Sequence, residues 1–318
     1  MRKFILDLDT GIDDTLAIAY ALGSPEAELI GITATYGNVT MSQGIRNDLA
    51  ITDLFGHAEV PVYAGLPHAT NKNTFEVLEG SRLIHGKNGI GDVTIPDSPR
   101  CQEASSAIDF IINSAHKYGK DLTYVATGPL TNIAAAVKQD PSIKEIMGGI
   151  VIMGGALTVT GNVAPWREAN ISQDPEAANA LFTSGAQCTM VGLDVTLQTL
   201  LTTNETKQWR ALGTPAAAFL SDMTDYYIHA YELTSPGLGG CGLHDPLAVA
   251  VAVDPTLVKT LGVNLKVETD GATRGRTIGD KDRLNDATKT TQVAIKVDVE
   301  RFLDEFMTRT SLVVSEQQ

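Results

Sequence analysis

Residues 3–22 read KFILDLDTGIDDTLAIAYAL, an apolar run of strand length, then a cluster of aspartates, then a second apolar stretch. The first run predicts a strand over Lys3–Asp9, and the second predicts a helix over Asp14–Leu22. Runs of these two kinds alternate through most of the chain, which is typical of a parallel sheet covered by helices on both faces. The expected fold class is therefore α/β, a single doubly wound domain over residues 1–318 with a mostly parallel central sheet.

The other expected elements follow in the same alternating order. Strands are expected at Leu29–Thr35, Val60–Ala64, Leu122–Thr127, Gly149–Met153 and Cys188–Val191. Helices are expected at Met41–Leu54, Ala104–His116, Thr131–Lys138, Pro175–Thr183, Pro215–Leu233 and Pro246–Val253. The sequence contains no repeat, low-complexity tract or linker-like boundary that would favour a second domain.

The composition is ordinary for a globular protein with a large core, because 43% of the residues are hydrophobic and 19% are charged. The first apolar run stops at Leu6, too short for a signal segment, and no later run approaches the length needed to span a bilayer. Cys101, Cys188 and Cys241 lack metal or redox spacing. We therefore expect a cytoplasmic protein with free thiols and no membrane partner.

The formal net charge is −14, from 38 acidic against 24 basic residues. No cluster of lysines and arginines interrupts this acidity. A surface of this sign repels nucleic acid and anionic membranes, and it argues against a polyanionic substrate. We expect no nucleic-acid partner.

Chemically unusual residues gather just after the expected strands, which is where open parallel sheets bind ligands. The segment DLDTGIDD, residues 7–14, contains four carboxylates, and strand alternation puts Asp7 and Asp9 on the same side of the first strand. Their mutual repulsion requires a counter-charge. Carboxylates with backbone oxygen form the hard ligand set that selects Ca²⁺ or Mg²⁺. Asp13 and Asp14 taken alone could instead be ordinary partners of a helix N-terminus.

This segment resembles the signature of the inosine-uridine preferring nucleoside hydrolase family, usually written DTDPGxDD, with departures at Leu8 and Thr10. The family has a Rossmann-like core. Six further blocks resemble the family in the same order and at about the same spacing. They are TYGN (35–38), IHGKNGIG (84–91), ATGPLTNIA (126–134), MGGA (153–156), GNVAPWREANISQDPEAA (161–178) and LHDPLAVA (243–250).

The resemblance implies calcium-dependent hydrolysis of ribonucleosides to ribose and free base, in nucleoside salvage. It implies a Ca²⁺ bound by the side chains of Asp9, Asp14 and Asp245 and by the backbone carbonyl of Thr127, together with water and two ribose hydroxyls. Asp9 is also the implied base that activates the attacking water. The resemblance assigns the ribose hydroxyls to Asp13, Asn162, Glu168 and Asn170, and it places Asn38 and Met153 near the sugar.

The chemistry of the reaction explains why such residues are needed. Breaking a ribosyl C–N bond builds positive charge on the sugar, so the site must provide a nucleophilic water, a stabilised cation and a neutralised leaving base. His244 precedes Asp245, and an imidazole titrates near neutral pH, so His244 is expected to protonate the leaving base. His85 lies in a glycine-rich segment with the composition of a mobile flap, and the resemblance places it beside the base. Tyr227 and Tyr231 share one helical face and either contact the base or pack in the core.

The two departures from the signature differ in their expected effect. Leu8 should point away from Asp7 and Asp9 and pack in the core. Thr10 replaces a proline that would stiffen the metal loop, so loop rigidity and metal affinity are the properties in question.

The preferred base depends on the loops that form the pocket, and the assembly depends on the surfaces between subunits. His85 and His244 resemble the broad or pyrimidine-tolerant members of the family rather than the purine-specific ones, but the pocket is built from loops and the preference stays open. The resemblance implies a homodimer or a homotetramer.

Two other interpretations fit part of the sequence. DLDTG also resembles the DxDx[TV] motif of haloacid-dehalogenase-like phosphatases, with Asp7 as the nucleophile, but this leaves Asp13 and Asp14 without a role. A non-catalytic nucleoside or sugar sensor could retain the fold and the metal, although the intact Asp9 and Asp245 argue against lost catalysis.

Overall fold

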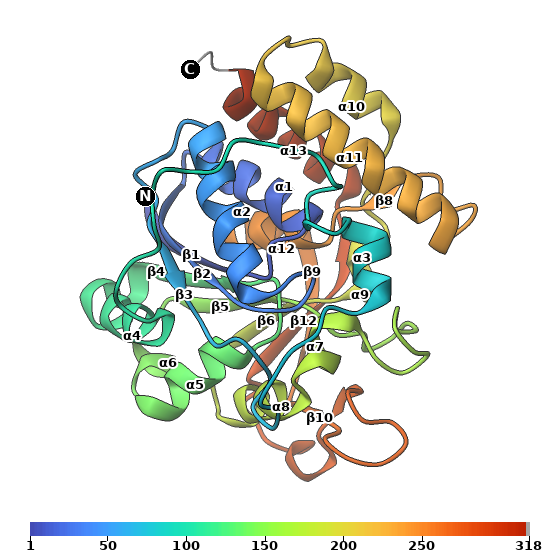
Figure 1. The fold of residues 1–318 in the computed structure, drawn as a ribbon. Helices are drawn as coiled ribbons and strands as arrows, with labels where there is room; N and C mark the ends of the chain where they lie inside the picture. Colours follow the sequence, from blue (N-terminus) through green and yellow to red (C-terminus); the bar gives the residue numbers. More distant parts are fainter. Residues whose placement is uncertain (316–318) are drawn as a thin grey trace.

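The computed structural model describes residues 1–315, and one large sheet forms its centre (Figure 1). Neighbouring strands pair in parallel, except that the last edge strand pairs antiparallel. The expected α/β class with a mostly parallel sheet is thereby confirmed. Across the described residues, the sheet has eight strands in the order β3 (Val62–Ala64), β2 (Ala27–Ala34), β1 (Arg2–Leu8), β4 (Leu122–Ala126), β5 (Gly149–Met153), β6 (Cys188–Val191), β12 (Thr291–Val297) and β9 (Val258–Val263).

Helices follow most of the strands. They are α1 (Ile12–Leu22), α2 (Met41–Leu54), α3 (Glu79–His85), α4 (Ala107–Tyr118), α5 (Thr131–Gln139), α6 (Ile143–Ile146), α7 (Ala169–Gln173), α8 (Pro175–Thr183), α9 (Leu193–Thr196), α10 (Thr203–Arg210), α11 (Pro215–Thr234), α12 (His244–Val253) and α13 (Val299–Ser315). Two small antiparallel pairs join β7 (Leu200–Leu201) to β8 (Cys241–Gly242) and β10 (Leu265–Val267) to β11 (Thr277–Gly279). Within residues 1–315, none of the helices combines the length and the apolar character needed to cross a membrane.

Each face of the sheet has its own hydrophobic core. Phe4, Leu6 and Leu8 of β1 pack on the face covered by α1, α2, α11, α12 and α13. Ile5 packs on the opposite face, with α4, α5 and α8. Figure 1 shows these two groups of helices on opposite sides of the sheet. Because both faces are covered, Phe4, Ile5 and Leu6 form an unbroken apolar run in β1, and Leu8 packs in the core as expected.

All the strands and helices expected from the sequence are present, with ends shifted by up to three residues. The largest shift is at α4, which begins at Ala107 because the hydroxyl of Ser106 accepts a hydrogen bond from the Asp109 amide and caps the helix. The helix expected from Pro246 begins earlier, so that His244 and Asp245 lie in its first turn.

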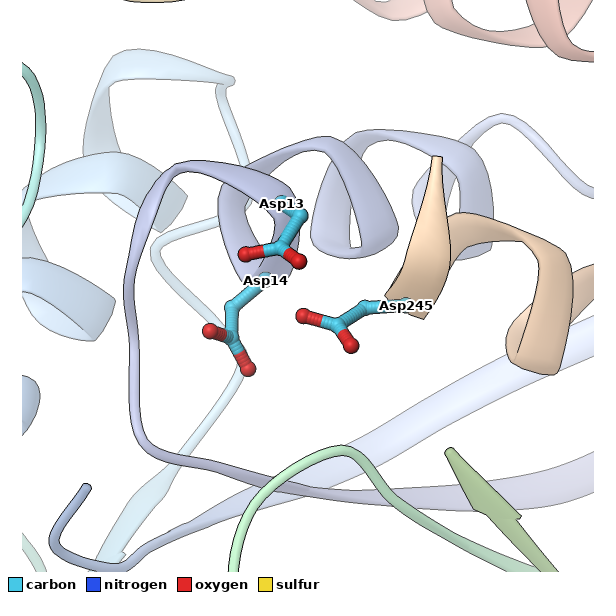
Figure 2. A group of neighbouring side chains, drawn as sticks. All are labelled: Asp13, Asp14 and Asp245. Carbon is cyan, nitrogen blue, oxygen red and sulfur yellow. The ribbon is translucent and has the colours of Figure 1, made fainter. Parts of the chain in front are cut away.

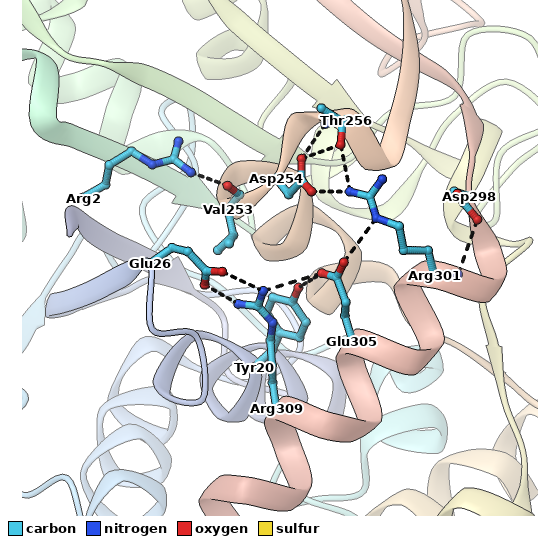
Figure 3. A network of polar contacts seen from close by, with 10 residues as sticks. All are labelled: Arg2, Tyr20, Glu26, Val253, Asp254, Thr256, Asp298, Arg301, Glu305 and Arg309. Carbon is cyan, nitrogen blue, oxygen red and sulfur yellow. Dashed lines mark hydrogen bonds and ion pairs between the residues drawn. The ribbon is translucent and has the colours of Figure 1, made fainter.

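The C-terminal part contains elements that the sequence patterns did not predict. β12 lies between β6 and β9, and it is partly exposed, so its hydrophobic pattern is weak. α13 packs over the face that carries α1 and α12. Figure 3 shows how polar contacts hold it there: Arg309 pairs with Glu26 at 2.7 Å, and Arg301 contacts Asp254 and lies 2.8 Å from the Thr256 hydroxyl.

The sheet changes its direction of winding between β1 and β4. β1 leads to β2 and β3 on one side, whereas β4 leads to β5 and β6 on the other. Doubly wound sheets bind ligands at such a switch point, outside the carboxyl ends of the strands. The amide of Thr127 donates to the carbonyl of Asp7 at 2.9 Å, so the ends of β1 and β4 lie side by side. Asp9 and Thr127 therefore meet at this point.

Candidate active site

Three aspartates from two distant segments of the chain meet beside the switch point (Figure 2). Asp13 and Asp14 lie in the first turn of α1, and Asp245 lies in the first turn of α12. One carboxylate oxygen of each residue lies within 4.8 Å of an oxygen of the other two. All three residues are buried. The starts of two helices thus direct negative charge at one point inside the protein.

Asp9 follows β1 and is fixed by the loop that follows β2. Its Oδ2 accepts a hydrogen bond from the Asn38 amide at 2.6 Å. Its Oδ1 is buried and has no hydrogen-bond partner among the described residues. A Cβ on Gly37 would lie 1.9 Å from Oδ2, and a Cβ on Gly128 would lie 2.9 Å from Oδ1, so glycine is required at Gly37 and strongly favoured at Gly128. One oxygen of Asp9 is therefore held in place, and the other is free to bind.

Asp14 and the carbonyl of Thr127 are also held by specific donors. Oδ1 of Asp14 accepts from the Thr127 hydroxyl at 2.6 Å, and Oδ2 lies 3.4 Å from Nδ2 of Asn38. Nδ2 of Asn170 donates to the carbonyl of Thr127 at 2.6 Å and to that of Met153 at 3.2 Å. Asn170 therefore fixes the direction of the carbonyl that the sequence assigns to the metal.

Burial raises the pKa of every carboxyl group in this cluster. For Asp13, burial followed by the charge of Asp14 raises the pKa to about 7. The same two causes raise the pKa of Asp9 well above its usual range. Burial followed by the charges of Asp13 and Asp14 does the same for Asp245. A nearby positive charge would therefore favour the anionic form of each of these carboxyl groups.

The donor set fits a hard divalent cation. It consists of carboxylate oxygens and one backbone carbonyl, which are the ligands that Ca²⁺ and Mg²⁺ prefer. Oδ1 of Asp9 and Oδ1 of Asp13 are buried acceptors without a partner in the described chain, and burying such atoms is costly unless something binds them. The family resemblance implies Asp9, Asp14, Asp245 and Thr127 as the metal ligands. The group of acidic side chains that the structure brings within 4.8 Å of one another contains Asp13 rather than Asp9.

A cavity of about 360 Å³ opens over this cluster, within the size range of small-ligand sites. Asp9 and Asp14 are fully buried and are not among its lining residues. Among the described residues, no lysine or arginine lines the cavity. The other residues that the sequence analysis assigned to the site all line it, namely Asp13, Asn38, His85, Thr127, Met153, Asn162, Glu168, Asn170, Tyr227, Tyr231, His244 and Asp245.

His244 lies in the cavity wall with both ring nitrogens occupied. Nε2 lies 2.6 Å from the Tyr231 hydroxyl, and Nδ1 lies 2.7 Å from the Thr196 hydroxyl. Burial lowers the pKa of His244 to about 4, so the ring is neutral near pH 7. A neutral imidazole donates from one nitrogen and accepts at the other. Tyr231, His244 and Thr196 therefore form a hydrogen-bonded chain that can pass a proton.

Tyr227 and His85 are anchored to the start of α1. The hydroxyl of Tyr227 donates to Oδ2 of Asp13 at 3.2 Å. Nδ1 of His85 accepts from the Ile12 amide at 3.1 Å and lies 3.9 Å from Oδ1 of Asp13. Burial, followed by the charge of His244, lowers the pKa of His85 to about 3. Both side chains thus present a fixed surface to the cavity.

Glu168 and Asn162 line the cavity but also bind backbone. Both carboxylate oxygens of Glu168 accept hydrogen bonds from backbone amides, at 2.8 to 3.0 Å, and Glu168 caps α7. Oδ1 of Asn162 accepts from the Ala169 amide at 3.0 Å. These two residues therefore shape the loop before α7, and their contacts with a sugar stay a prediction.

Asp7 lies outside the cavity, although it belongs to the same aspartate-rich segment. Its Oδ1 accepts from the Thr33 hydroxyl at 2.6 Å and from Nδ2 of Asn132 at 2.8 Å, and the residue is fully buried. A phosphatase nucleophile must reach its substrate. The placement of Asp7 therefore removes the support for the phosphatase interpretation.

Several residues of the site were not predicted. Thr196, which contacts His244, follows β6, so the rule that ligands bind at strand ends could have identified it. Leu78, Ile84 and Leu197 form an apolar part of the lining. They carry no chemical signal in the sequence, because an isolated apolar residue is common in any segment.

The chain is similar to known nucleoside hydrolases over almost its whole length. The family model described as inosine-uridine preferring nucleoside hydrolase matches residues 4–304. The inosine-uridine preferring nucleoside hydrolase of Leishmania major is 39% identical, with 95% of each chain covered. Uridine nucleosidase 1 of Arabidopsis thaliana is 38% identical, with 88% of this chain and 82% of the relative covered.

A solved structure agrees in both fold and sequence. The purine-preferring ribonucleoside hydrolase from Gardnerella vaginalis is 70% identical, covers 99% of each chain and superposes with a TM-score of 0.98. With the family match over nearly the whole chain, this likeness establishes the expected family. The chain belongs to the inosine-uridine preferring nucleoside hydrolase family, the N-ribosyl hydrolases that split ribonucleosides into ribose and free base.

Proposed function

We propose that this enzyme is a Ca²⁺-dependent ribonucleoside hydrolase that prefers purine nucleosides. The observation that carries the calcium proposal is the buried cluster of Asp13, Asp14 and Asp245 under a cavity that has no lysine or arginine in its described lining. Mg²⁺ fits the same donor types but demands a tighter octahedral shell, whereas Ca²⁺ accepts several carboxylates in a flexible geometry. Calcium is therefore the cation proposed.

Asp9 is the proposed base for the attacking water. Its Oδ2 is held by the Asn38 amide, and its free Oδ1 is buried at the switch point, so it can accept a proton without moving. When bound, the cation supplies Lewis acidity that lowers the pKa of a neighbouring water. Asp9 then needs to remove the proton only from an already acidified water.

The ribose is proposed to lie over Asp13, with its hydroxyls toward the carboxylates. Asp13 is held by Tyr227, and Asn170 and Met153 are joined to each other by a hydrogen bond across the floor of the cavity. Anionic and amide oxygens at this place favour the positive charge that develops on the sugar during C–N cleavage. Asn38, Asn162 and Glu168 are the other proposed contacts of the sugar.

The leaving base is proposed to face His85, Tyr231 and His244. A neutral His244 joined to the Tyr231 hydroxyl can relay a proton toward the cavity as the C–N bond breaks, because the ring takes up a replacement proton, ultimately from solvent, at its other nitrogen and stays neutral. Thr196 holds the opposite nitrogen of the ring, so the imidazole cannot turn away. The protonated base then leaves as a neutral molecule.

The proposed preference for purine nucleosides rests on the sequence identity of this chain to two relatives of different described specificity. The Gardnerella enzyme described as purine-preferring is 70% identical to this chain, whereas the uridine nucleosidase of Arabidopsis is 38% identical. Cleavage of pyrimidine nucleosides is proposed as the secondary activity, because His85 and His244 resemble the broad or pyrimidine-tolerant members of the family. A role in nucleoside salvage, a cytoplasmic location and a homodimer or homotetramer are proposed from the family resemblance.

The decisive experiment measures ribose release from inosine, adenosine, uridine and cytidine, before and after EDTA treatment and after addition of Ca²⁺ or Mg²⁺. We expect EDTA to abolish release, Ca²⁺ to restore it, and kcat/KM to be higher for the two purine nucleosides. Full activity of a preparation without detectable metal would refute the calcium proposal. Faster cleavage of uridine than of inosine would refute the purine preference and leave the calcium proposal intact.

A further inference from the structure

Thr10 lies between Asp9 and the start of α1, in the loop that carries the proposed metal ligands. Two consecutive residues of α2 hold it. Its hydroxyl donates to Oδ1 of Asp48, and its carbonyl accepts from Nδ2 of Asn47 at 3.2 Å. Thr10, Asn47 and Asp48 are all fully buried. The loop is therefore tied to α2 through both the side chain and the backbone of one residue.

Burial of the Asp48 carboxyl group is unfavourable in free energy. Burial raises the pKa of its carboxyl group well above the usual range, and Oδ2 has no hydrogen-bond partner in the described chain. Among residues 1–315, Thr10 is the only residue that hydrogen-bonds to this carboxyl group. A buried carboxyl group with one hydrogen-bond partner lowers the stability of the fold. The contact that Asp48 makes in return is its hydrogen bond with Thr10, which holds the loop.

Asn47 extends the same contact to the segment after His85. Its Nδ2 also donates to the carbonyl of Asn88 at 2.9 Å, and its Oδ1 accepts from Nε2 of Gln43 at 2.8 Å. The side chain is thus fixed within α2 while it contacts Thr10 and Asn88. Asn47 therefore connects one turn of α2 both to the loop that contains Thr10 and to the glycine-rich segment that contains Asn88.

We propose that Thr10 and Asp48 form a positioning pair that holds the metal loop in its binding shape. A proline at this position of the family signature restricts the backbone of the loop through its ring. In this chain, the hydrogen bond between Thr10 and Asp48 restricts the same loop. The amide of Thr10 donates no hydrogen bond within residues 1–315, so a proline would remove none here. A loop that is already ordered loses less conformational entropy when its carboxylates gather around a cation.

This inference rests on the proposed calcium site, and it is tested by calcium affinity rather than by activity. Isothermal titration of the EDTA-treated chain with CaCl₂ gives Kd, and the melting temperature without metal gives stability. Thr10→Val keeps the branched shape but removes the hydroxyl, and Kd should rise between about twofold and tenfold, the range for one net hydrogen bond. Thr10→Ser keeps the hydroxyl, so Kd should stay within about twofold of the wild type.

A double-mutant cycle separates the pair from general damage to the fold. Asp48→Leu should weaken Ca²⁺ binding as much as Thr10→Val does, but it should have no further effect in a Thr10→Pro background, where the ring holds the loop. Asp48→Asn keeps an acceptor oxygen and should retain affinity. A loss with Asp48→Asn as large as with Asp48→Leu would assign the effect to charge and overturn the proposal.

A matched control uses a similar pair outside the site. The hydroxyl of Thr206 on α10 donates to Oδ1 of Asp225 at 2.6 Å. Thr206→Val should lower the melting temperature without changing Kd. If Thr10→Val also changes only the melting temperature, Thr10 is a structural residue and the proposal is wrong. A wild-type chain that binds no Ca²⁺ would instead refute the calcium site, and this inference with it.

Discussion

The hydroxyl of Tyr231 lies 2.6 Å from Nε2 of His244, and both residues are buried in the wall of the cavity. Tyr231 comes from the last turns of α11, whereas His244 begins α12. The contact therefore places a hydroxyl from one helix and an imidazole from another on the same proton path. His244 in turn connects this hydroxyl to Thr196, at 2.7 Å from Nδ1.

The first prediction follows from this pair. His244→Ala and Tyr231→Phe should each lower kcat on inosine, by up to about 10²-fold for His244, because the leaving base no longer receives a proton. With p-nitrophenyl riboside, whose leaving group departs without a proton, the loss should nearly vanish. His229→Ala, at an exposed position of α11, is the control and should have no effect on either substrate. Equal losses on the two substrates would remove His244 from the acid role.

Asp9→Asn keeps the shape of the side chain but removes its basicity. The Asn38 amide can still donate to the remaining oxygen, so the loop should keep its structure. We expect kcat to fall by at least about 10²-fold, while substrate binding changes much less. Single-turnover kinetics with inosine would separate the two effects. Unchanged kcat would exclude Asp9 as the base.

Gly37→Ala tests whether the fixed position of Asp9 matters. The added Cβ would lie 1.9 Å from Oδ2 of Asp9, so the carboxylate must move or the loop must open. We expect a drop in kcat that approaches that of Asp9→Asn. Gly149→Ala is the matched control, because a Cβ there meets nothing within 4 Å. Wild-type kinetics for Gly37→Ala would show that the contact with Gly37 does not set the rate.

Asp14→Asn and Asp245→Asn should weaken calcium binding by at least about tenfold, since even residues that only support metal ligands change affinity by that much. The loss should be visible as a higher Ca²⁺ concentration needed for half-maximal activity. Asp222→Asn, on the exposed side of α11, serves as the control for the loss of one negative charge. If all three variants need the same Ca²⁺ concentration, the cluster is not the metal site.

The last prediction concerns the sugar. A site that binds the 2′ and 3′ hydroxyls through carboxylates should reject 2′-deoxynucleosides by about 10⁴-fold or more. Nucleoside 5′-monophosphates should also be poor substrates, because no lysine or arginine is among the described residues that line the cavity, and Arg167 lies outside it. The test compares kcat/KM for inosine, 2′-deoxyinosine and inosine 5′-monophosphate. Comparable values for the deoxy compound would refute the hydroxyl contacts.

The sequence predicted six of the eight strands of the main sheet, because their mostly apolar runs are the pattern of strands buried on both faces. Polar residues such as Asp9, Asn38 and Thr127 stood out because they follow such strands, whereas Asn170 and Asp245 were assigned by the family resemblance. The sequence did not predict β9 and β12, whose exposed positions dilute the pattern. The single-domain organisation of residues 1–318 stays a prediction.

Contacts between distant segments were harder to predict than the residues themselves. Strand alternation predicts Asp7 and Asp9 on the same side of the strand, yet their partners differ. Thr33 and Asn132 bind Asp7, whereas the Asn38 amide binds Asp9. Likewise, the sequence shows only that Thr10 replaces the proline of the family signature. It does not show that the Thr10 hydroxyl contacts Asp48. One-dimensional patterns give the direction of a side chain but not the partner that it meets.

The carboxylates of the cluster come from segments far apart in the chain, since Asp13 and Asp14 lie in the first turn of α1 and Asp245 lies in the first turn of α12. During synthesis on the ribosome, the two N-terminal aspartates emerge long before their third partner. A nascent chain that has not yet released α12 therefore cannot form the cluster. Under the proposed calcium dependence, Ca²⁺ binds only after α12 has emerged and then favours the docking of α12 on α1.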